Sequence, residues 1–283
     1  MKLALIRRAG SRYGGAELYT GRLLAALVEA GHEVHLFAED WADLPAGVTW
    51  RRVVVTGPRH ARPRRFAEAV LRQLDPGTFD CVFSLERTLR QDVYRAGDGV
   101  HAAWLSQRRH FASWWRRPWI GCGAFHREML AIERRTFNPA NTGHVIVNSE
   151  MVRGEIRAHF AFPEERIHLV RNGVLADRFR GGDRAGHRRR LGLGEAETLL
   201  LFVGSGWERK GLRFVLAAMR DPRLAAAGVT LLVLGKGRPP WPTCWCFRRS
   251  MSRRPTSCPR RCRWGGRGAG QGRRRADPPR TPS

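Results

Sequence analysis

The segment ETLLLFVGSGWERKGLRFVLAAMR, residues 197–220, indicates the fold. Its apolar run stops at a Gly-Ser-Gly turn, residues 204–206, a stretch with helical periodicity follows, and a second apolar run covers residues 229–235. Strand, glycine turn, helix and strand in this order predict a βαβ unit of a parallel sheet. The turn also presents Arg209 and Lys210 just before the helix. Free backbone N–H groups and two cations there would favour a phosphate, although both residues could equally be solvated charges in a βα loop.

The same alternation runs through the rest of the chain. It predicts an α/β fold with two Rossmann-like domains, residues 1–177 and an incomplete second domain at 178–240. Ligands of such folds bind at the carboxyl ends of the strands, so we expect a cleft between the two domains. The strands expected in the first domain are residues 2–7, 32–40, 49–55, 79–85, 143–149 and 166–173, and the helices are 16–31, 66–77, 126–137 and 150–160.

Residues 241–283 have a different composition. They contain no Leu, Ile or Val but twelve Arg against one Asp. Such a segment cannot bury enough apolar surface to order itself, so we expect disorder and a shifted reading frame or an unrelated terminus. Its four cysteines, Cys244, Cys246, Cys258 and Cys262, do not follow the C-x-x-C spacing of zinc sites, and we expect no metal.

The charge of the whole chain is strongly positive. Its 51 basic and 25 acidic side chains give a formal balance of +26, which favours anionic partners: nucleic acid, phospholipid or a phosphorylated substrate. No apolar run approaches the roughly 18 residues of a membrane span, and no signal peptide is evident. We therefore expect a cytoplasmic protein.

Five motifs in a fixed order point to a family. They are YGGAE at 13–17, QDVYRAGD at 91–98, VIVNSEMVRGEI at 145–156, HLVRNGVLADRF at 168–179 and FVGSGWERKG at 202–211. Together they resemble the GT-B glycosyltransferases of family 4, in particular the lipopolysaccharide core glucosyltransferases. The resemblance implies retaining transfer of a hexose, glucose first of all, from a nucleotide diphosphate sugar such as UDP-glucose to a lipopolysaccharide core acceptor, with no cofactor. The family's acidic pair in the second domain has no counterpart here, so we expect the chain to be inactive as it stands.

The resemblance also assigns a donor site. Gly14 and Gly15 would face the donor diphosphate, although a plain tight turn needs the same glycines. Arg209 and Lys210 would stabilise the negative charge that grows on the diphosphate as it leaves. Fixed cations in this place would let the enzyme work without a metal.

The acceptor side of the reaction is assigned to Asp98 and His101. By resemblance, Asp98 lies near the acceptor, where its carboxylate could orient or deprotonate a hydroxyl group. Two alternatives stay open: Asp98 could cap a helix or form an ion pair with Arg95. His101, three residues later, could share the catalytic role.

Two further motifs are interpreted as structural. Gly173 follows Asn172 at the family's hinge between domains, where we expect a turn with positive φ. Asn148 and Ser149 are the expected N-cap of the helix that begins near Glu150.

The stretch WLSQRRHFASWWRRPWI, residues 104–120, mixes indole and cationic side chains. This pattern suits an anionic membrane surface, because indoles lie at headgroup depth and guanidinium groups meet lipid phosphates. Two alternatives remain: stacking on single-stranded nucleic acid, a partner that we do not expect, and a cap that packs its Trp residues inward. A non-catalytic basic protein that binds nucleic acid or anionic lipid is the rival to the enzyme. The residues assigned to membrane or acceptor contact are Trp114, Trp115, Arg116, Arg117 and Trp119.

Overall fold

The computed structural model describes residues 1–10, 15–174, 176–208 and 210–235. The chain divides into two compact units between residues 174 and 175. The tail assigned to residues 241–283, with its four cysteines, lies outside the described residues.

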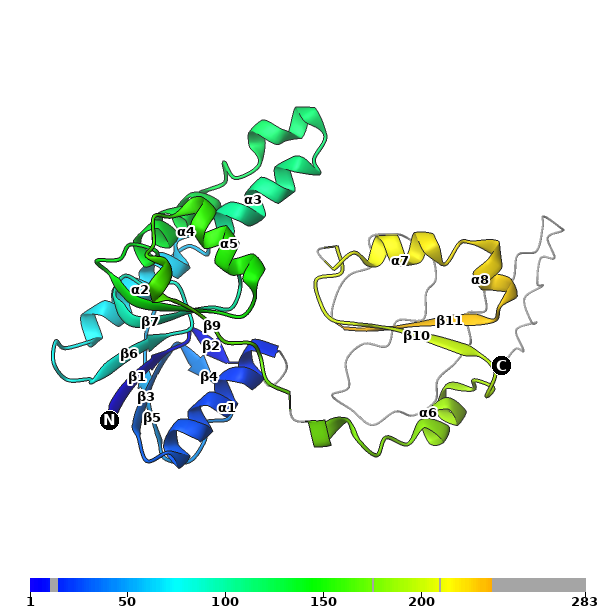
Figure 1. Ribbon diagram of the computed structural model, residues 1–283, viewed down its shortest axis with the longest axis horizontal. Coiled ribbons are helices and arrows are strands. Elements are labelled where there is room, and N and C mark those ends of the chain that lie inside the picture. Colours follow the sequence, from blue (N-terminus) through cyan, green and yellow to red (C-terminus); the bar gives the residue numbers. More distant parts are fainter. Residues whose placement is uncertain (11–14, 175, 209, 236–283) are drawn as a thin grey trace, which may run out of the picture. The chain divides into compact units, whose positions relative to one another are not determined.

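The first unit is built on one parallel sheet of seven strands in the order β5-β3-β1-β6-β7-β8-β9 (Figure 1). Every pairing is parallel, and the register sets Leu5 opposite Leu36 and Phe83. The strands are β1 (Lys2–Ile6), β3 (Glu33–Ala38), β5 (Val48–Arg52), β6 (Cys81–Ser84), β7 (Gln91–Ala96), β8 (Thr142–Val147) and β9 (Ile167–Leu169). A two-residue pairing of β2 (Ala9–Gly10) with β4 (Asp40–Trp41) forms a separate small sheet.

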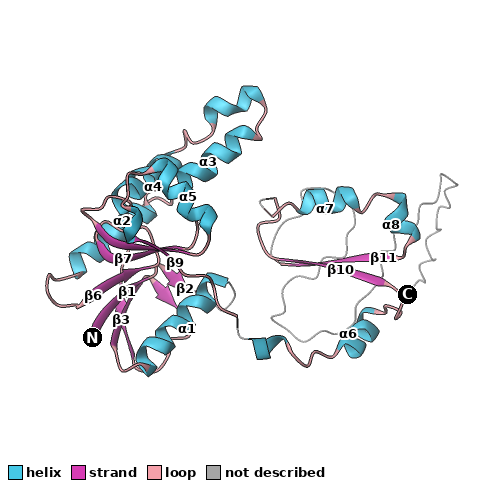
Figure 2. Ribbon diagram, viewed as in Figure 1, coloured by secondary structure: helices cyan, strands magenta, loops and turns pink. Residues whose placement is uncertain are grey.

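Helices cover both faces of this sheet, as a parallel sheet requires (Figure 2). On one face α1 (Gly15–Glu29) packs Leu24 against Leu5 and Leu36. On the other face lie α2 (Arg62–Gln73), α4 (Ala124–Thr136) and α5 (Glu150–His159). Two clusters form the core on that side, one centred on Phe37 and Phe66 and one on Val145 and Ile156.

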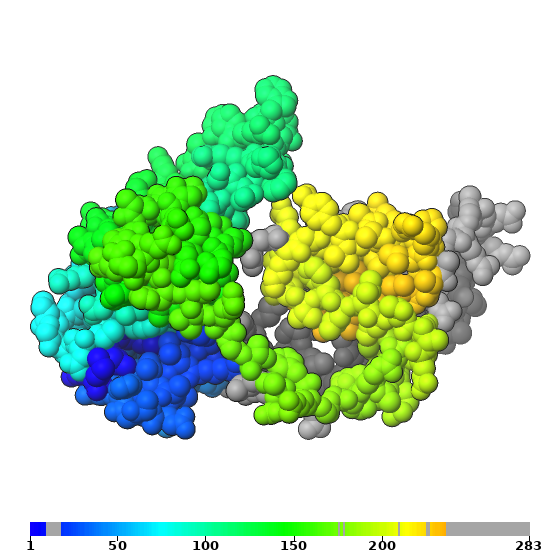
Figure 3. All heavy atoms as spheres, in the orientation of Figure 1, coloured from blue at the N-terminus to red at the C-terminus, as the bar shows by residue number. Residues whose placement is uncertain are grey.

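One strand of the seven-stranded sheet and the helix after it were not foreseen. The QDVYRAGD motif forms β7 in the interior of the sheet, and α3 (His101–His110) follows it at once. The polar residue Gln91 is buried in β7, where its side chain forms hydrogen bonds with the side chains of Thr88 and Thr142. The strand therefore lacks the unbroken apolar run that is expected of a buried strand. Helix α3 continues into a 3-10 helix, η1 (Trp114–Trp119), and this arm protrudes from the body of the first unit (Figure 3).

The second unit contains the βαβ pattern that the sequence predicted. Strands β10 (Thr198–Val203) and β11 (Val229–Leu234) pair in parallel, and Trp207, Leu212, Leu216 and Val233 form their core. The other elements are η3 (Ala176–Phe179), α6 (Arg184–Leu191), α7 (Leu212–Ala218) and α8 (Pro222–Ala226).

The expectation for Gly173 was wrong. Its φ lies outside the left-handed region, and a Cβ placed there would meet nothing within 4 Å. Backbone geometry therefore does not require glycine at this position. The expected N-cap of α5 was right: Ser149 accepts a hydrogen bond from Val152 N at 3.4 Å.

Candidate active site

The loop that follows β7, residues 97–100, carries Asp98 at the carboxyl end of the sheet. Asp98 is exposed, and Gly99 beside it has a φ of 73°. Three side chains from other elements hold the backbone of this loop. Arg87 Nη2 donates to Gly99 O at 2.7 Å, Glu155 Oε2 accepts from Val100 N at 3.2 Å, and Asn148 Nδ2 donates to Gly97 O at 3.3 Å. The main chain around Asp98 is thus fixed while its carboxylate stays open to solvent.

A buried carboxylate on α4 completes this support. Glu133 has no exposed surface and accepts from Arg87 Nε at 3.0 Å. It also accepts from the N–H groups of His101 at 2.7 Å and Ala102 at 3.0 Å, so it caps the start of α3 from outside that helix. Burial alone would lower the pKa of Arg87, but its interactions with Tyr94 and Glu133 outweigh burial and raise it.

Neither alternative for Asp98 describes its surroundings. The N-cap of α3 is Val100, and that cap makes no side-chain hydrogen bond. Among the described residues Arg95 bonds Asn172 and not Asp98. This leaves the carboxylate of Asp98 available to a substrate.

His101 forms a pair with a histidine that the sequence did not single out. Its Nε2 lies 3.1 Å from Nδ1 of His126 on α4, and the two rings stack at 5.2 Å. The Trp104 ring stacks on His101 at 5.4 Å and lies 5.8 Å from the His126 ring, so the three rings form one cluster. Burial lowers the pKa of both imidazoles, which favours their neutral forms at neutral pH. His126 is separated from His101 by 25 residues, and its place in the sequence gave no signal of the contact.

The predicted donor residues belong to different units and are described separately. Gly15 is the first residue of α1, whereas Gly14 and Arg209 lie outside the described residues. Lys210 is exposed and reaches back over the end of β10, where a Cβ at Gly204 would collide with its Nζ.

The start of α7 differs from the expectation for a phosphate site. Gly211 is the N-cap in the left-handed region, with a φ of 77°. Its N–H donates to Glu208 O at 3.2 Å, and the N–H of Leu212 donates to Trp207 O at 3.0 Å. Because these N–H groups are already bonded, they are not available to a phosphate. A diphosphate site here is supported by the side chain of Lys210 and not by the start of the helix.

The arm presents the predicted interfacial residues to solvent. Trp114, Trp115 and Trp119 are 81%, 58% and 79% exposed, so the alternative in which they pack inward is not what the structure has. The Arg116 guanidinium lies 5.2 Å from the Trp115 ring centroid, and Arg117 Nε donates to Ala112 O at 3.2 Å. Indole and guanidinium groups therefore share one exposed arm.

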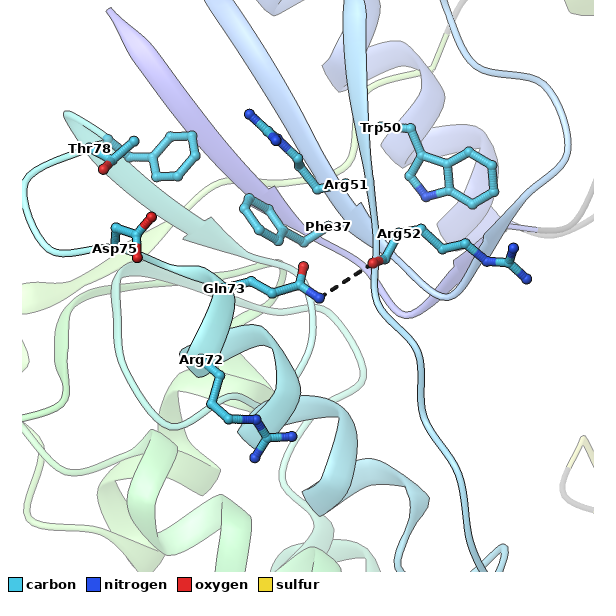
Figure 4. A pocket seen from close by; sticks show the side chains of 9 residues that line it. Phe37, Trp50, Arg51, Arg52, Arg72, Gln73, Asp75 and Thr78 are labelled. Atoms are coloured by element: carbon cyan, nitrogen blue, oxygen red, sulfur yellow. Dashed lines mark hydrogen bonds between the residues drawn. The ribbon is translucent and has the colours of Figure 1, made fainter.

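A cavity of about 510 Å³ lies elsewhere in the first unit. Residues of β3, β5, the end of α2 and the loop after it line it, and Gln73 Nε2 donates to Arg52 O at 3.4 Å (Figure 4). None of the predicted site residues lines this cavity. Within the described ranges, no three His, Cys, Asp or Glu side chains are grouped to hold a metal ion. No helix of that part of the chain is long and apolar enough to span a bilayer.

A family model named Glycosyltransferase Family 4 matches residues 13–178, more than half of the chain. The chain belongs to this family. Lipopolysaccharide glucosyltransferase WaaG of Escherichia coli K12 is 24% identical over 234 residues, which cover 80% of this chain and 61% of WaaG. The crystal structure of WaaG superposes with a TM-score of 0.67 at 21% identity, covering 83% of this chain and 70% of that one. Anabaena HepE, solved in complex with UDP and glucose, has a TM-score of 0.52 at 17% identity, covering 82% and 60%.

These similarities establish the fold and the family. The α/β architecture is of the GT-B type, as the sequence motifs predicted, and the chain is a glycosyltransferase by family. The chain spans about three fifths of the length of WaaG.

Proposed function

We propose that this protein transfers a hexose, glucose first of all, from UDP-glucose or a similar nucleotide sugar to a lipopolysaccharide core or related glycan, with retention of anomeric configuration. The similarity to WaaG supports the acceptor class, and the complex of HepE with UDP and glucose supports the donor class. The transfer requires an acceptor hydroxyl to be held against the anomeric carbon.

The rigid loop around Asp98 carries this proposal. Its backbone is bonded to Arg87, Glu155 and Asn148, while the carboxylate is exposed and makes no bond to a described residue. A carboxylate carried on a backbone fixed in this way can orient the acceptor hydroxyl or accept its proton. His101, kept neutral by burial, offers a second acceptor for that proton.

The donor side of the proposal rests on Lys210, with Arg209 as its predicted partner. Negative charge develops on the leaving diphosphate, and a cation fixed beside it stabilises the transition state more than the ground state. No metal is needed for this role.

A transfer assay with UDP-glucose and core-truncated lipopolysaccharide tests the proposal. Because the chain spans part of WaaG, the assay is run on this chain and on a fusion that replaces residues after 240 with the matching WaaG segment. We expect low turnover from the chain and higher turnover from the fusion. In the fusion, Asp98→Asn should lower kcat by about 10²- to 10⁴-fold, the range for loss of a general base. The exposed Asp75→Asn is the matched control. Transfer that is unaffected by Asp98→Asn, or no transfer by either protein, would leave the non-catalytic basic binder as the better account.

We further propose that the arm holds the enzyme to the cytoplasmic face of an anionic membrane as a peripheral protein. The exposed indoles and neighbouring guanidinium groups support this proposal. Sedimentation with anionic vesicles should weaken as salt rises and in a Trp114→Ser, Trp115→Ser, Trp119→Ser variant. Phe214→Ser, which removes an exposed ring beside Arg213, is the control. Equal binding to neutral and anionic vesicles at low salt would refute the electrostatic part.

A further inference from the structure

Two arginines with little exposed surface lie beside the candidate active site, and their partners differ in charge. Arg87 forms an ion pair with the buried Glu133. Arg95, on β7, is 8% exposed, and its Nη2 donates to the neutral amide oxygen of Asn172 at 2.5 Å. Among the described residues no carboxylate pairs with Arg95. The positive charge of Arg87 is therefore neutralised inside the protein, and that of Arg95 is not.

The guanidinium of Arg95 is held in one position from three sides. Its Cζ lies 3.7 Å from the ring centroid of Tyr19 on α1. The guanidinium lies against Gly97, where an added Cβ would collide with Nη1, so a larger residue there would displace the guanidinium from this position. Asn172 supplies the third contact. An arginine fixed in this manner is pre-organised, because little side-chain freedom is lost when a ligand binds.

A buried cation without an anion is costly, and the contacts of Arg95 offset only part of that cost. An aromatic face and an amide oxygen both attract a guanidinium, but neither cancels its charge. We propose that Arg95 binds a phosphoryl group of a substrate, which supplies the missing negative charge. Guanidinium suits this task because its planar fork matches the oxygen atoms of a phosphate. Placed two residues before Gly97, such an anchor would hold the phosphorylated ligand beside the loop that carries Asp98.

The proposal deepens the proposed function, on which it rests, and names the chemistry recognised at this position. A phosphoryl group can come from the diphosphate of the nucleotide sugar or from a phosphate on the acceptor glycan. Both sources offer the same oxygen atoms to Arg95. Binding measurements with matched probes separate them.

Calorimetry with the full chain provides the test. UDP is compared with uridine, and glucose 6-phosphate with glucose. Arg95→Gln should weaken the binding of one phosphorylated probe about 10- to 100-fold, the weight of hydrogen bonds to charged groups, and leave uridine and glucose unchanged. Arg95→Lys keeps the charge but loses the fork, and should weaken the same probe less. It also keeps the test valid if Arg95→Gln fails to fold.

Two control variants separate the proposed role from simpler ones. Arg157→Gln makes the same charge change at a side chain that is 58% exposed, and should leave binding unchanged. Asn172→Ala removes the hydrogen bond but keeps the cation, and should have a smaller effect than Arg95→Gln. A loss confined to UDP assigns Arg95 to the donor diphosphate, and a loss confined to glucose 6-phosphate assigns it to the acceptor.

Other outcomes would overturn the inference. Unchanged binding in a folded Arg95→Gln protein, or equal losses in Arg95→Gln and Asn172→Ala, would make Arg95 only a clamp on the segment after β9. Sugar transfer by the fusion together with unchanged binding would reject this inference and keep the proposed function. Phosphate binding that depends on Arg95, in a protein that transfers no sugar, would reject the function and keep the inference.

Discussion

Glu133 shows how one residue can organise a site without touching a substrate. Its carboxylate has no exposed surface and is bonded to Arg87 and to the first two N–H groups of α3. The partners come from two separate places in the chain, residue 87 and residues 101–102. Glu133 therefore joins α4 to the start of α3 and, through Arg87, to the loop that carries Asp98.

We expect Glu133→Ala to be strongly destabilising. The substitution leaves the Arg87 guanidinium buried without its anion, a change that costs about 3–5 kcal/mol in other buried pairs. Urea denaturation measures the loss. Glu128→Ala, which removes the partly exposed partner of Arg64, is the control and should cost about 1 kcal/mol or less. If the two variants lose similar stability, Glu133 does not have the role described. Replacing both Arg87 and Glu133 by apolar residues should restore part of the loss.

The His101–His126 pair predicts a dependence of stability on pH. Burial lowers the pKa of both imidazoles below the ordinary value of 6.5, with Arg87 and His126 lowering that of His101, Glu133 raising it, and Arg108 lowering that of His126. Between the folded pKa and 6.5 the unfolded chain binds more protons than the folded chain. Stability contributed by this pair is therefore complete above 6.5 and falls as pH drops toward the folded pKa values.

Urea denaturation across this pH window, with and without the two histidines, tests the prediction. In the double variant His101→Asn, His126→Asn the loss of unfolding free energy on acidification should be smaller than in the unaltered chain. His159→Asn, at an exposed site on α5, is the control and should keep the full loss. A double variant as acid-sensitive as the unaltered chain would contradict the prediction.

At the scale of secondary-structure elements, glycines have opposite roles in a strand and in a helix. Gly143, in β8, lies so close to β7 that a Cβ would stand 2.6 Å from the carbonyl oxygen of Asp92. Gly154, in α5, has nothing within 4 Å of an added Cβ. The first glycine permits two strands to approach, whereas the second only lowers helix propensity.

A glycine-to-alanine substitution should therefore change the stability of the protein in opposite directions at the two positions. Gly154→Ala should stabilise the protein by about 0.5–1 kcal/mol, because alanine loses less backbone entropy in a helix. Gly143→Ala should destabilise the protein, because the added Cβ would collide with the backbone of β7 and the pairing of β7 with β8 would have to shift. Thermal unfolding of both variants reads out the signs directly. A stabilised Gly143→Ala protein would show that the close approach of β7 and β8 is not needed.

At the scale of the whole molecule, the two units have separate hydrophobic cores. Ile156 belongs to a cluster of first-unit residues only, and Leu216 to a cluster of second-unit residues only. Stability should therefore be divided between two cooperative units instead of being shared by one.

Calorimetric unfolding of two core variants tests this division. Each variant should destabilise only the unit that contains it: Ile156→Ala the first unit and Leu216→Ala the second. The unfolding free energy of that unit should fall by about 2–5 kcal/mol, and the transition of the other unit should not change. Each variant serves as the control for the other. A single transition that both variants shift equally would mean that the units unfold together.

The sequence alone determined the order of most elements and the family. Apolar runs, helical periods and glycine turns are local signals, so the βαβ units and the N-cap at Ser149 could be recognised without a structure. The family motifs predicted roles for Asp98, His101 and Lys210, and these roles stay predictions. Strand β7 was not predicted because its buried residue Gln91 is polar and forms hydrogen bonds with Thr88 and Thr142. In a sequence, such a residue cannot be distinguished from an exposed polar residue.

The tertiary structure decided which side chains act together. Glu133 lies 32 residues from the N–H of His101 that it caps, and Arg95 lies 77 residues from Asn172. Only folding of the parallel sheet brings such partners within bonding distance, because consecutive parallel strands are joined by long crossovers. The sequence also suggested free N–H groups before α7, but local bonds from Gly211 and Leu212 use them. The sequence indicated which residues could carry charge or bind a substrate, whereas the partners of those residues depend on three-dimensional packing.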